Sequence, residues 1–174
     1  GAYSGDFTIY NHIDKDNIQN GVKVNAGFGA SGSCVLTVEH VRFDGEKQNE
    51  RYNVSFDDGS RNTGFGGDYS GATAYFSGKL IGKNCTFYNA CWWGCSVNNE
   101  GEFYDCTFDS NVGGVAVNKK ASFTRCTFKN NWLSGAQVSG ESAAFDNCTF
   151  YGAECGIASS TNILTVYNCK FYNH

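Results

Sequence analysis

The sequence predicts an all-β protein, a single-domain parallel β-helix of about eight coils with about 21 residues in each coil. Two observations lead to this prediction: a short motif recurs at a nearly constant spacing, and the composition suits strands and turns. The 174 residues include 22 Gly, 14 Phe, 10 Tyr and 9 Cys but no Pro. Gly and Asn favour turns and aromatic residues favour strands, so the composition argues against helices.

The recurring motif is Phe-x-x-Cys-Thr-Phe, which is clearest at 103–108, 123–128 and 145–150. Counting two weaker copies, its Cys positions are separated by 21, 20, 22 and 21 residues, at Cys85, Cys106, Cys126, Cys148 and Cys169. A Gly column at Gly94, Gly114, Gly135 and Gly156 keeps the same step. A repeat of this length indicates a solenoid, and the Leu frame of a leucine-rich repeat is missing.

Strand periodicity divides the residues of each coil between an inner and an outer face. Alternate side chains of a strand share a face, so Cys and Phe of each Cys-Thr-Phe are expected inside and Thr outside. Stacked coils lie about 4.8 Å apart, which places like residues in columns. We therefore predict an inner Cys column and a structural Phe column made of Phe87, Phe108, Phe128, Phe150 and Phe171.

Weaker copies of the pattern precede the regular part of the chain. The segment 36–43, LTVEHVRF, matches 164–171, LTVYNCKF, and the segment 7–11, FTIYN, matches 164–168, LTVYN. The segment 62–65 is predicted to supply a further coil with Thr63 at the Cys position. One domain is thus expected over 1–174, with irregular coils in 1–70 and regular repeats in 71–174.

These motifs resemble right-handed parallel β-helix proteins, both the pectate-lyase-like group and, more closely, the polymorphic outer-membrane-protein type of surface repeat. Gly-Gly-Val at 113–115 and Phe-x-x-Asn at 108–111 and 128–131 carry the resemblance, whereas 87–90 and 150–153 end in Ala. The resemblance implies a right-handed coil, which the crossover preference also favours, and an extracellular or cell-surface location. It implies no activity, because fold and function separate easily.

The inner Cys column is predicted to hold reduced thiols, because side chains in register point the same way and cannot easily reach disulfide geometry. Cys34, Cys91 and Cys155 lie off this column and are the candidate disulfide cysteines. The number of cysteines is odd, so at least one thiol is free or intermolecular. The spacing in CWWGC at 91–95 does not match a metal or redox motif, and no metal or cofactor is predicted.

Aromatic residues and sequons supply candidate surface sites. Trp92, Trp93 and Trp132 are expected at a turn, where they could stack on sugar rings or cover a corner of the core. The sequons at Asn53, Asn84 and Asn147 are candidate glycosylation sites, and the last two are expected at outward corners.

A polysaccharide-degrading enzyme of this fold would need clustered carboxylates beside a basic residue. The candidates are Asp105, Arg125 and Asp146 on successive coils, with Asp109 and Lys129 nearby. Their alternating charges fit an ion-paired column equally well, and no catalytic residue is assigned.

The net charge of −4 and the lack of a basic cluster argue against nucleic-acid binding. No apolar run reaches the roughly 18 residues of a membrane helix, so membrane insertion is not expected. The last strand, in NCKFYNH, has no polar cap and is expected to accept the first coil of another copy. A fragment cut from a longer β-helix would leave the same bare end. We therefore predict an extracellular structural β-solenoid, a surface or filament-forming protein whose copies stack head to tail. The alternative is a carbohydrate-binding or polysaccharide-degrading β-helix module.

Overall fold

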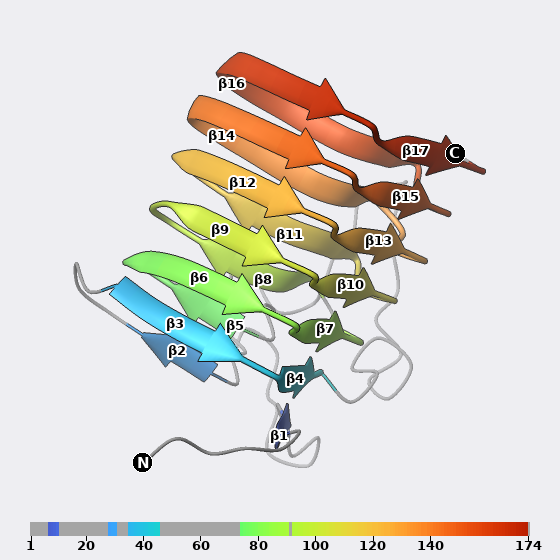
Figure 1. The fold of residues 1–174 in the computed structure, drawn as a ribbon. Helices are drawn as coiled ribbons and strands as arrows, with labels where there is room; N and C mark the ends of the chain where they lie inside the picture. The colour runs from blue at the N-terminus through green and yellow to red at the C-terminus, as the bar shows by residue number, and fades with distance from the viewer. Residues whose placement is uncertain (1–6, 11–27, 31–34, 46–73, 91, 174) are drawn as a thin grey trace, which may run out of the picture.

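The computed structural model describes residues 7–10, 28–30, 35–45, 74–90 and 92–173, which build a parallel β-solenoid with turns of about 21 residues (Figure 1). All strand pairs in these ranges are parallel, and none of these residues is helical. The predicted all-β, parallel β-helix class is confirmed.

Each turn contributes one strand to each of three faces. The first face contains β2 (Phe28–Ala30), β5 (Ala74–Phe76), β8 (Trp93–Val97) and β11 (Gly113–Val117). The second face contains β3 (Val35–Glu39), β6 (Lys79–Lys83), β9 (Gly101–Tyr104) and β12 (Lys120–Thr124). The third face contains β1 (Phe7–Tyr10), β4 (Val41–Asp44), β7 (Thr86–Tyr88), β10 (Thr107–Asp109), β13 (Thr127–Lys129), β15 (Thr149–Tyr151) and β17 (Lys170–Tyr172). The long strands β14 (Ser134–Asp146) and β16 (Cys155–Tyr167) run through the first and second faces and join them into one sheet.

Within the described residues, the solenoid has about five turns rather than the eight predicted for the chain. Strand β4 pairs directly with β7. The coil predicted at Thr63 lies outside the described residues. Strand β1 pairs with β4 on the third face, with Phe7 opposite Val41, so the predicted match of 7–11 with 164–168 is wrong. An alternating apolar segment this short fits any face, and the sequence alone does not select one.

Two stacks of phenylalanine rings fill the core. In the first stack, neighbouring rings of Phe87, Phe108, Phe128 and Phe150 lie nearly parallel, with centroids 5.0, 4.9 and 4.5 Å apart. The second stack comes from the second face and contains Phe103, Phe123 and Phe145, with spacings of 5.1 and 4.7 Å. Rings of the two stacks meet edge to face, an arrangement that aromatic rings favour. The spacing of the repeat therefore produces continuous stacking along the axis.

From β6 onward, two corners of each turn hold a residue with positive φ, between 48° and 67°, and His40 continues one of these columns in the turn before. One column precedes the inner Cys and contains His40, Asn84, Asp105, Arg125, Asn147 and Asn168. The other follows the third-face strand and contains Asn89, Ser110, Asn130, Gly152 and Asn173. Asn and Gly tolerate this left-handed region better than most residues, so the corners account for much of the Asn content.

The Asn of each Phe-x-x-Asn motif lies inside the solenoid. The Asn131 amide donates from Nδ2 to the Phe108 carbonyl at 2.9 Å, and its Oδ1 accepts the backbone N–H of Asn111 at 3.1 Å. Asn111 repeats the pattern one turn earlier, donating to the Phe87 carbonyl at 3.0 Å and accepting the N–H of Ala90 at 2.9 Å. The amide oxygens satisfy backbone N–H groups that lie beyond the third-face strands, where no ladder partner is available.

Candidate functional site

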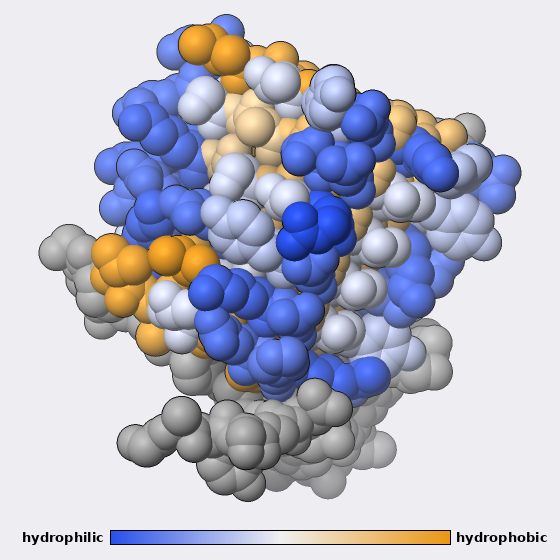
Figure 2. Space-filling view, viewed as in Figure 1, coloured by the Kyte–Doolittle hydropathy of each residue, from blue (hydrophilic) through white to orange (hydrophobic). Residues whose placement is uncertain are grey.

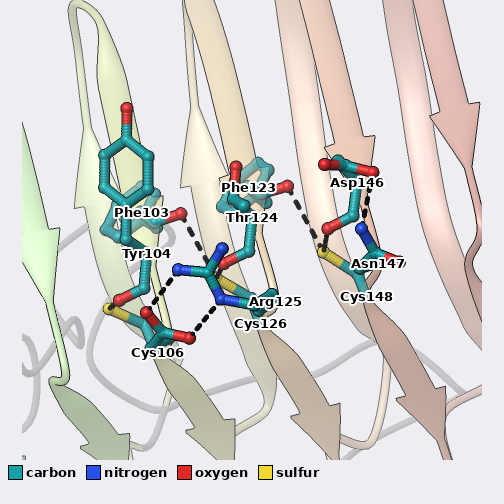
Figure 3. Close-up of polar contacts among 11 residues, drawn as sticks. Phe103, Tyr104, Cys106, Phe123, Thr124, Arg125, Cys126, Asp146, Asn147 and Cys148 are labelled. Atoms are coloured by element: carbon teal, nitrogen blue, oxygen red, sulfur yellow. Dashed lines mark hydrogen bonds and ion pairs between the residues drawn. The ribbon is translucent and has the colours of Figure 1, made fainter.

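Of the residues that the sequence offered for catalysis, Asp105 and Arg125 lie in a corner column, whereas Asp146 lies one residue before that column, at the end of β14 and opposite Thr124 (Figure 3). Arg125 binds Asp105 through two parallel contacts, Nε to Oδ1 at 2.7 Å and Nη2 to Oδ2 at 2.8 Å. These hydrogen bonds hold the pKa of Asp105 below its usual range and raise that of Arg125. On the next turn, Asp146 accepts a hydrogen bond from the Asn147 amide at 2.9 Å. The corner column thus holds an exposed ion pair followed by Asn147, and the Asp146 carboxylate lies beside the column rather than in it.

A second charged pair lies on the outer side of the third face. The Lys129 ammonium lies 3.3 Å from Asp109, which also accepts a hydrogen bond from the Asn130 amide at 3.1 Å. In the described part of the chain, no three His, Cys, Asp or Glu residues are grouped so as to hold a metal ion. These charges connect neighbouring turns, as cross-strand pairs commonly do.

The inner column of the third face holds free thiols. Cys85, Cys106, Cys126 and Cys148 are buried and Cys169, in the last turn, is partly exposed. Cys126 donates to the Phe103 carbonyl and Cys148 to that of Phe123, both at 3.4 Å (Figure 3). Hydrogen bonds with neighbouring thiols, and then burial, raise the pKa of Cys126, which keeps its thiol protonated.

The cysteines outside this column differ in exposure. Cys95 is fully buried on the first face, and burial raises the pKa of its thiol well above the ordinary value. Cys155 is exposed, with a free thiol that contacts the Ile157 carbonyl at 3.2 Å. Cys34 and Cys91 lie outside the described residues, so a disulfide among these three cysteines stays a prediction.

We expect alkylation of the folded chain to label Cys155 and to leave Cys106 and Cys126 unlabelled. Both column thiols are about 1% exposed and out of reach of the reagent, and the raised pKa of Cys126 makes that thiol a poor nucleophile as well. Pulse labelling with iodoacetamide, followed by peptide mass spectrometry, measures the labelling at each site. The same experiment in denaturant must label the column cysteines as strongly as Cys155. Disulfides between consecutive members of the column would contradict the expectation.

The three tryptophans do not form one exposed platform. Trp93 is buried and packs with Ala116, and Trp92 meets it edge to face at 5.8 Å. The Trp93 ring also lies against Gly113 of the next turn, where a side chain would collide with it. Trp132 is 42% exposed. Trp93 is therefore part of the packing, and a sugar could reach only Trp132 and part of Trp92.

Two of the three sequons lie on the solenoid, and Asn53 lies outside the described residues. Asn84 and Asn147 are exposed at positive-φ corners, the next residue is a buried Cys, and the Thr after it is in the outer column of the third face. Three separate structural columns thus generate Asn-Cys-Thr. Glycosylation at these two positions stays a prediction.

The last turn exposes apolar side chains at positions that are buried elsewhere. Leu164 and Val166 of β16 are 44% and 43% exposed, although their partners on β14, Ala143 and Phe145, are buried. Phe171 of β17 stacks on Phe150 at 4.7 Å, yet it is 47% exposed. Figure 2 shows apolar atoms gathered at this end of the molecule. Within the described residues, no further strand covers β16 and β17.

Two further exposed apolar residues, both in an outward column of the second face, were not among the predicted site residues. Ile163 at the start of the second-face part of β16, and Val35 at the start of β3, are each 63% exposed. The signal was present in the sequence: each directly precedes the Leu-Thr-Val of the matched segments, at the place where β6 and β12 carry Lys79 and Lys120.

Comparisons of the chain with protein-family models, with curated proteins and with solved structures gave no match. Across the described ranges, no helix is long and apolar enough to cross a bilayer. The end turn, the paired charges and the buried thiols are thus the features on which a function can be argued.

Proposed function

We propose that the chain is an extracellular structural β-solenoid, a surface or filament-forming protein whose copies stack head to tail. The observation that carries this proposal is the half-exposed state of Leu164 and Val166, which occupy inward positions of the last turn. Removing apolar surface from water is favourable by roughly 25 cal/mol per Å², so this end favours the addition of another turn.

The backbone of the last turn supports the same proposal. Strand β17 pairs only with β15, and β16 pairs only with β14, so each leaves one edge open within the described residues. An added parallel strand supplies hydrogen-bond partners to such an edge. Contact between opposite ends of two copies is heterologous and does not close, so repeated addition produces a filament.

The remaining surface supports a structural role more than a catalytic one. Asp105 and Asp109, offered as catalytic carboxylates, are each bound to a cation on the next turn. The exposed sequon residues Asn84 and Asn147 and the resemblance to surface repeats support an extracellular or cell-surface location. A carbohydrate-binding module is the second candidate, supported by the exposed ring of Trp132. Binding on a glycan array that disappears with Trp132→Ala would favour it.

The test compares Leu164→Asp with Thr165→Asp on the same strand. We expect the unchanged chain to assemble on prolonged incubation at high concentration, and Leu164→Asp to weaken assembly by more than about 100-fold, because it buries an unpaired charge at the joint. Thr165 is exposed and lies in an outward column, so Thr165→Asp should assemble normally. Light scattering and electron microscopy measure the products.

Melting curves of both variants show whether each remains folded. A chain that stays monomeric under all conditions, or equal loss of assembly in the two variants, would overturn the proposal.

A further inference from the structure

The first and last strands of the second face carry the same three residues at the same register positions. β3 contributes Leu-Thr-Val at 36–38 and β16 contributes Leu-Thr-Val at 164–166, and the pairings from β3 through β6, β9, β12 and β14 place them in the same three columns. Like residues stack on like in the Phe and Thr columns of the third face. Seating β3 of one copy on β16 of another would continue this rule.

The outer column beside these residues is also complementary at its two ends. Between its two ends, this column is polar or charged. Lys79 lies 3.5 Å from Glu100, and Lys120 lies 3.3 Å from Glu141 of the next turn. Its first and last members, Val35 and Ile163, are apolar and highly exposed. When β3 lies on β16, these two side chains become neighbours and leave water together.

This joint creates a conflict on the third face. Strands β3 and β4 belong to one turn, as do β16 and β17, so a copy whose β3 lies on β16 brings its β4 next to β17. The edge of β4 is already occupied by β1 of its own chain. In the free chain, Ile9 of β1 holds the register position opposite Phe43. In the joint, Phe171 of β17 would take that position and continue the Phe column. Lys170 would lie beside Arg42, whose guanidinium is already paired with Asp44 at 3.2 Å.

We propose that copies join by seating β3 on β16, and that β17 of one copy displaces β1 from β4 of the next. Strand β1 is then a removable plug that occupies the joint in the free chain and limits assembly. Phe43 is fully buried where β1 pairs with β4, whereas Phe171 at the other end of the column is exposed. This inference rests on the proposed function, because it specifies how the same two ends meet.

A charge swap tests the contact between β3 and β16. We expect Val35→Lys alone and Ile163→Glu alone to reduce assembly at least about tenfold, because each places an unpaired charge against an apolar neighbour. The double variant should recover most of the lost assembly, because its two opposite charges meet across the joint. In a joint that instead stacked β1 on β17, residues 35 and 163 would be a full rung further apart, and the double variant would not recover.

Weakening β1 tests the plug. Ile9→Asp places a carboxylate at the register position of Phe43 and should release β1 from β4. We expect assembly to become at least about tenfold faster, measured by light scattering from monomer prepared at low concentration. Ile9→Val is the matched control and should assemble at the rate of the unchanged chain. Phe171→Asp should block assembly with or without Ile9→Asp, and melting curves confirm that each monomer is folded.

The outcomes separate this inference from the proposed function. The inference would be overturned if Ile9→Asp abolished filaments while the charges at 35 and 163 left them unaffected. Head-to-tail stacking by another joint would still stand in that case. If the unchanged chain and every variant, including Ile9→Asp, stayed monomeric, both the inference and the proposed function would be overturned. Faster assembly with Ile9→Asp together with recovery in the double variant supports the plug and its joint.

Discussion

Replacing Phe128 by Ala is expected to lower the free energy of unfolding by about 3–5 kcal/mol. Phe128 is almost completely buried, and its ring stacks between Phe108 at 4.9 Å and Phe150 at 4.5 Å. It also meets Phe123 edge to face at 5.5 Å. Removing the ring leaves a cavity in the middle of both stacks, which the paired strands on either side cannot close. Urea denaturation followed by circular dichroism measures the loss.

Two variants serve as controls for this result. Thr127→Ala changes the outward neighbour on the same strand and should cost less than about 1 kcal/mol. Phe171→Ala removes the same side chain from the exposed end of the stack, so its cost should lie between the other two. A loss below about 1 kcal/mol for Phe128→Ala would contradict its position in the core.

Asn131→Ala is expected to lower the free energy of unfolding by about 2–4 kcal/mol, because it leaves the buried Asn111 N–H without its partner and removes the bonds of the amide to the Phe108 carbonyl and the Asn111 side chain. Ala occurs naturally at the equivalent positions of other turns, Ala90 and Ala153, so the shape of the site accepts the substitution. The measured change therefore reports the hydrogen bonds more than the packing.

The matched control for Asn131 is Asn118→Ala. Asn118 donates to Asn98 Oδ1 at 2.9 Å, but it lies at a partly exposed corner where water can replace the amide. We expect a loss below about 1 kcal/mol there. Similar losses at the two positions would show that the inner amides add nothing beyond an ordinary surface hydrogen bond.

The register of the repeat was predictable, because alternation and spacing act together. Phe108 opposite Phe128, and Thr107 opposite Thr127, follow from a step of 20 residues and from parallel stacking. The same reasoning failed for the N-terminal part, where spacing is irregular. Four residues, 7–10, alternate equally well on any face, and only the pairing of Phe7 with Val41 decides which one they join.

The polar part of the interior was not predicted, although its motif was visible. Phe-x-x-Asn gave the position of Asn131 but not the direction of its amide, which depends on carbonyls of the preceding turn. The positive-φ corners were hidden for a similar reason, since Arg125 and Asp105 occupy them as well as Asn. The sequence left open whether Trp93 contacts a sugar or covers the core, because its burial depends on Gly113, a residue of the next turn.

The direction of the hydrogen bonds between turns determines how the solenoid would respond to tension. Bonds such as that from the Thr127 N–H to the Cys106 carbonyl, at 2.9 Å, connect one turn to the next and run along the axis. Force applied between the two ends would load them lengthwise, so they would open in succession. Each turn touches only its neighbours, and each released turn of about 21 residues adds roughly 70 Å of extended chain. A fibre made of such turns would absorb mechanical work in repeated steps and would lengthen several-fold before it broke.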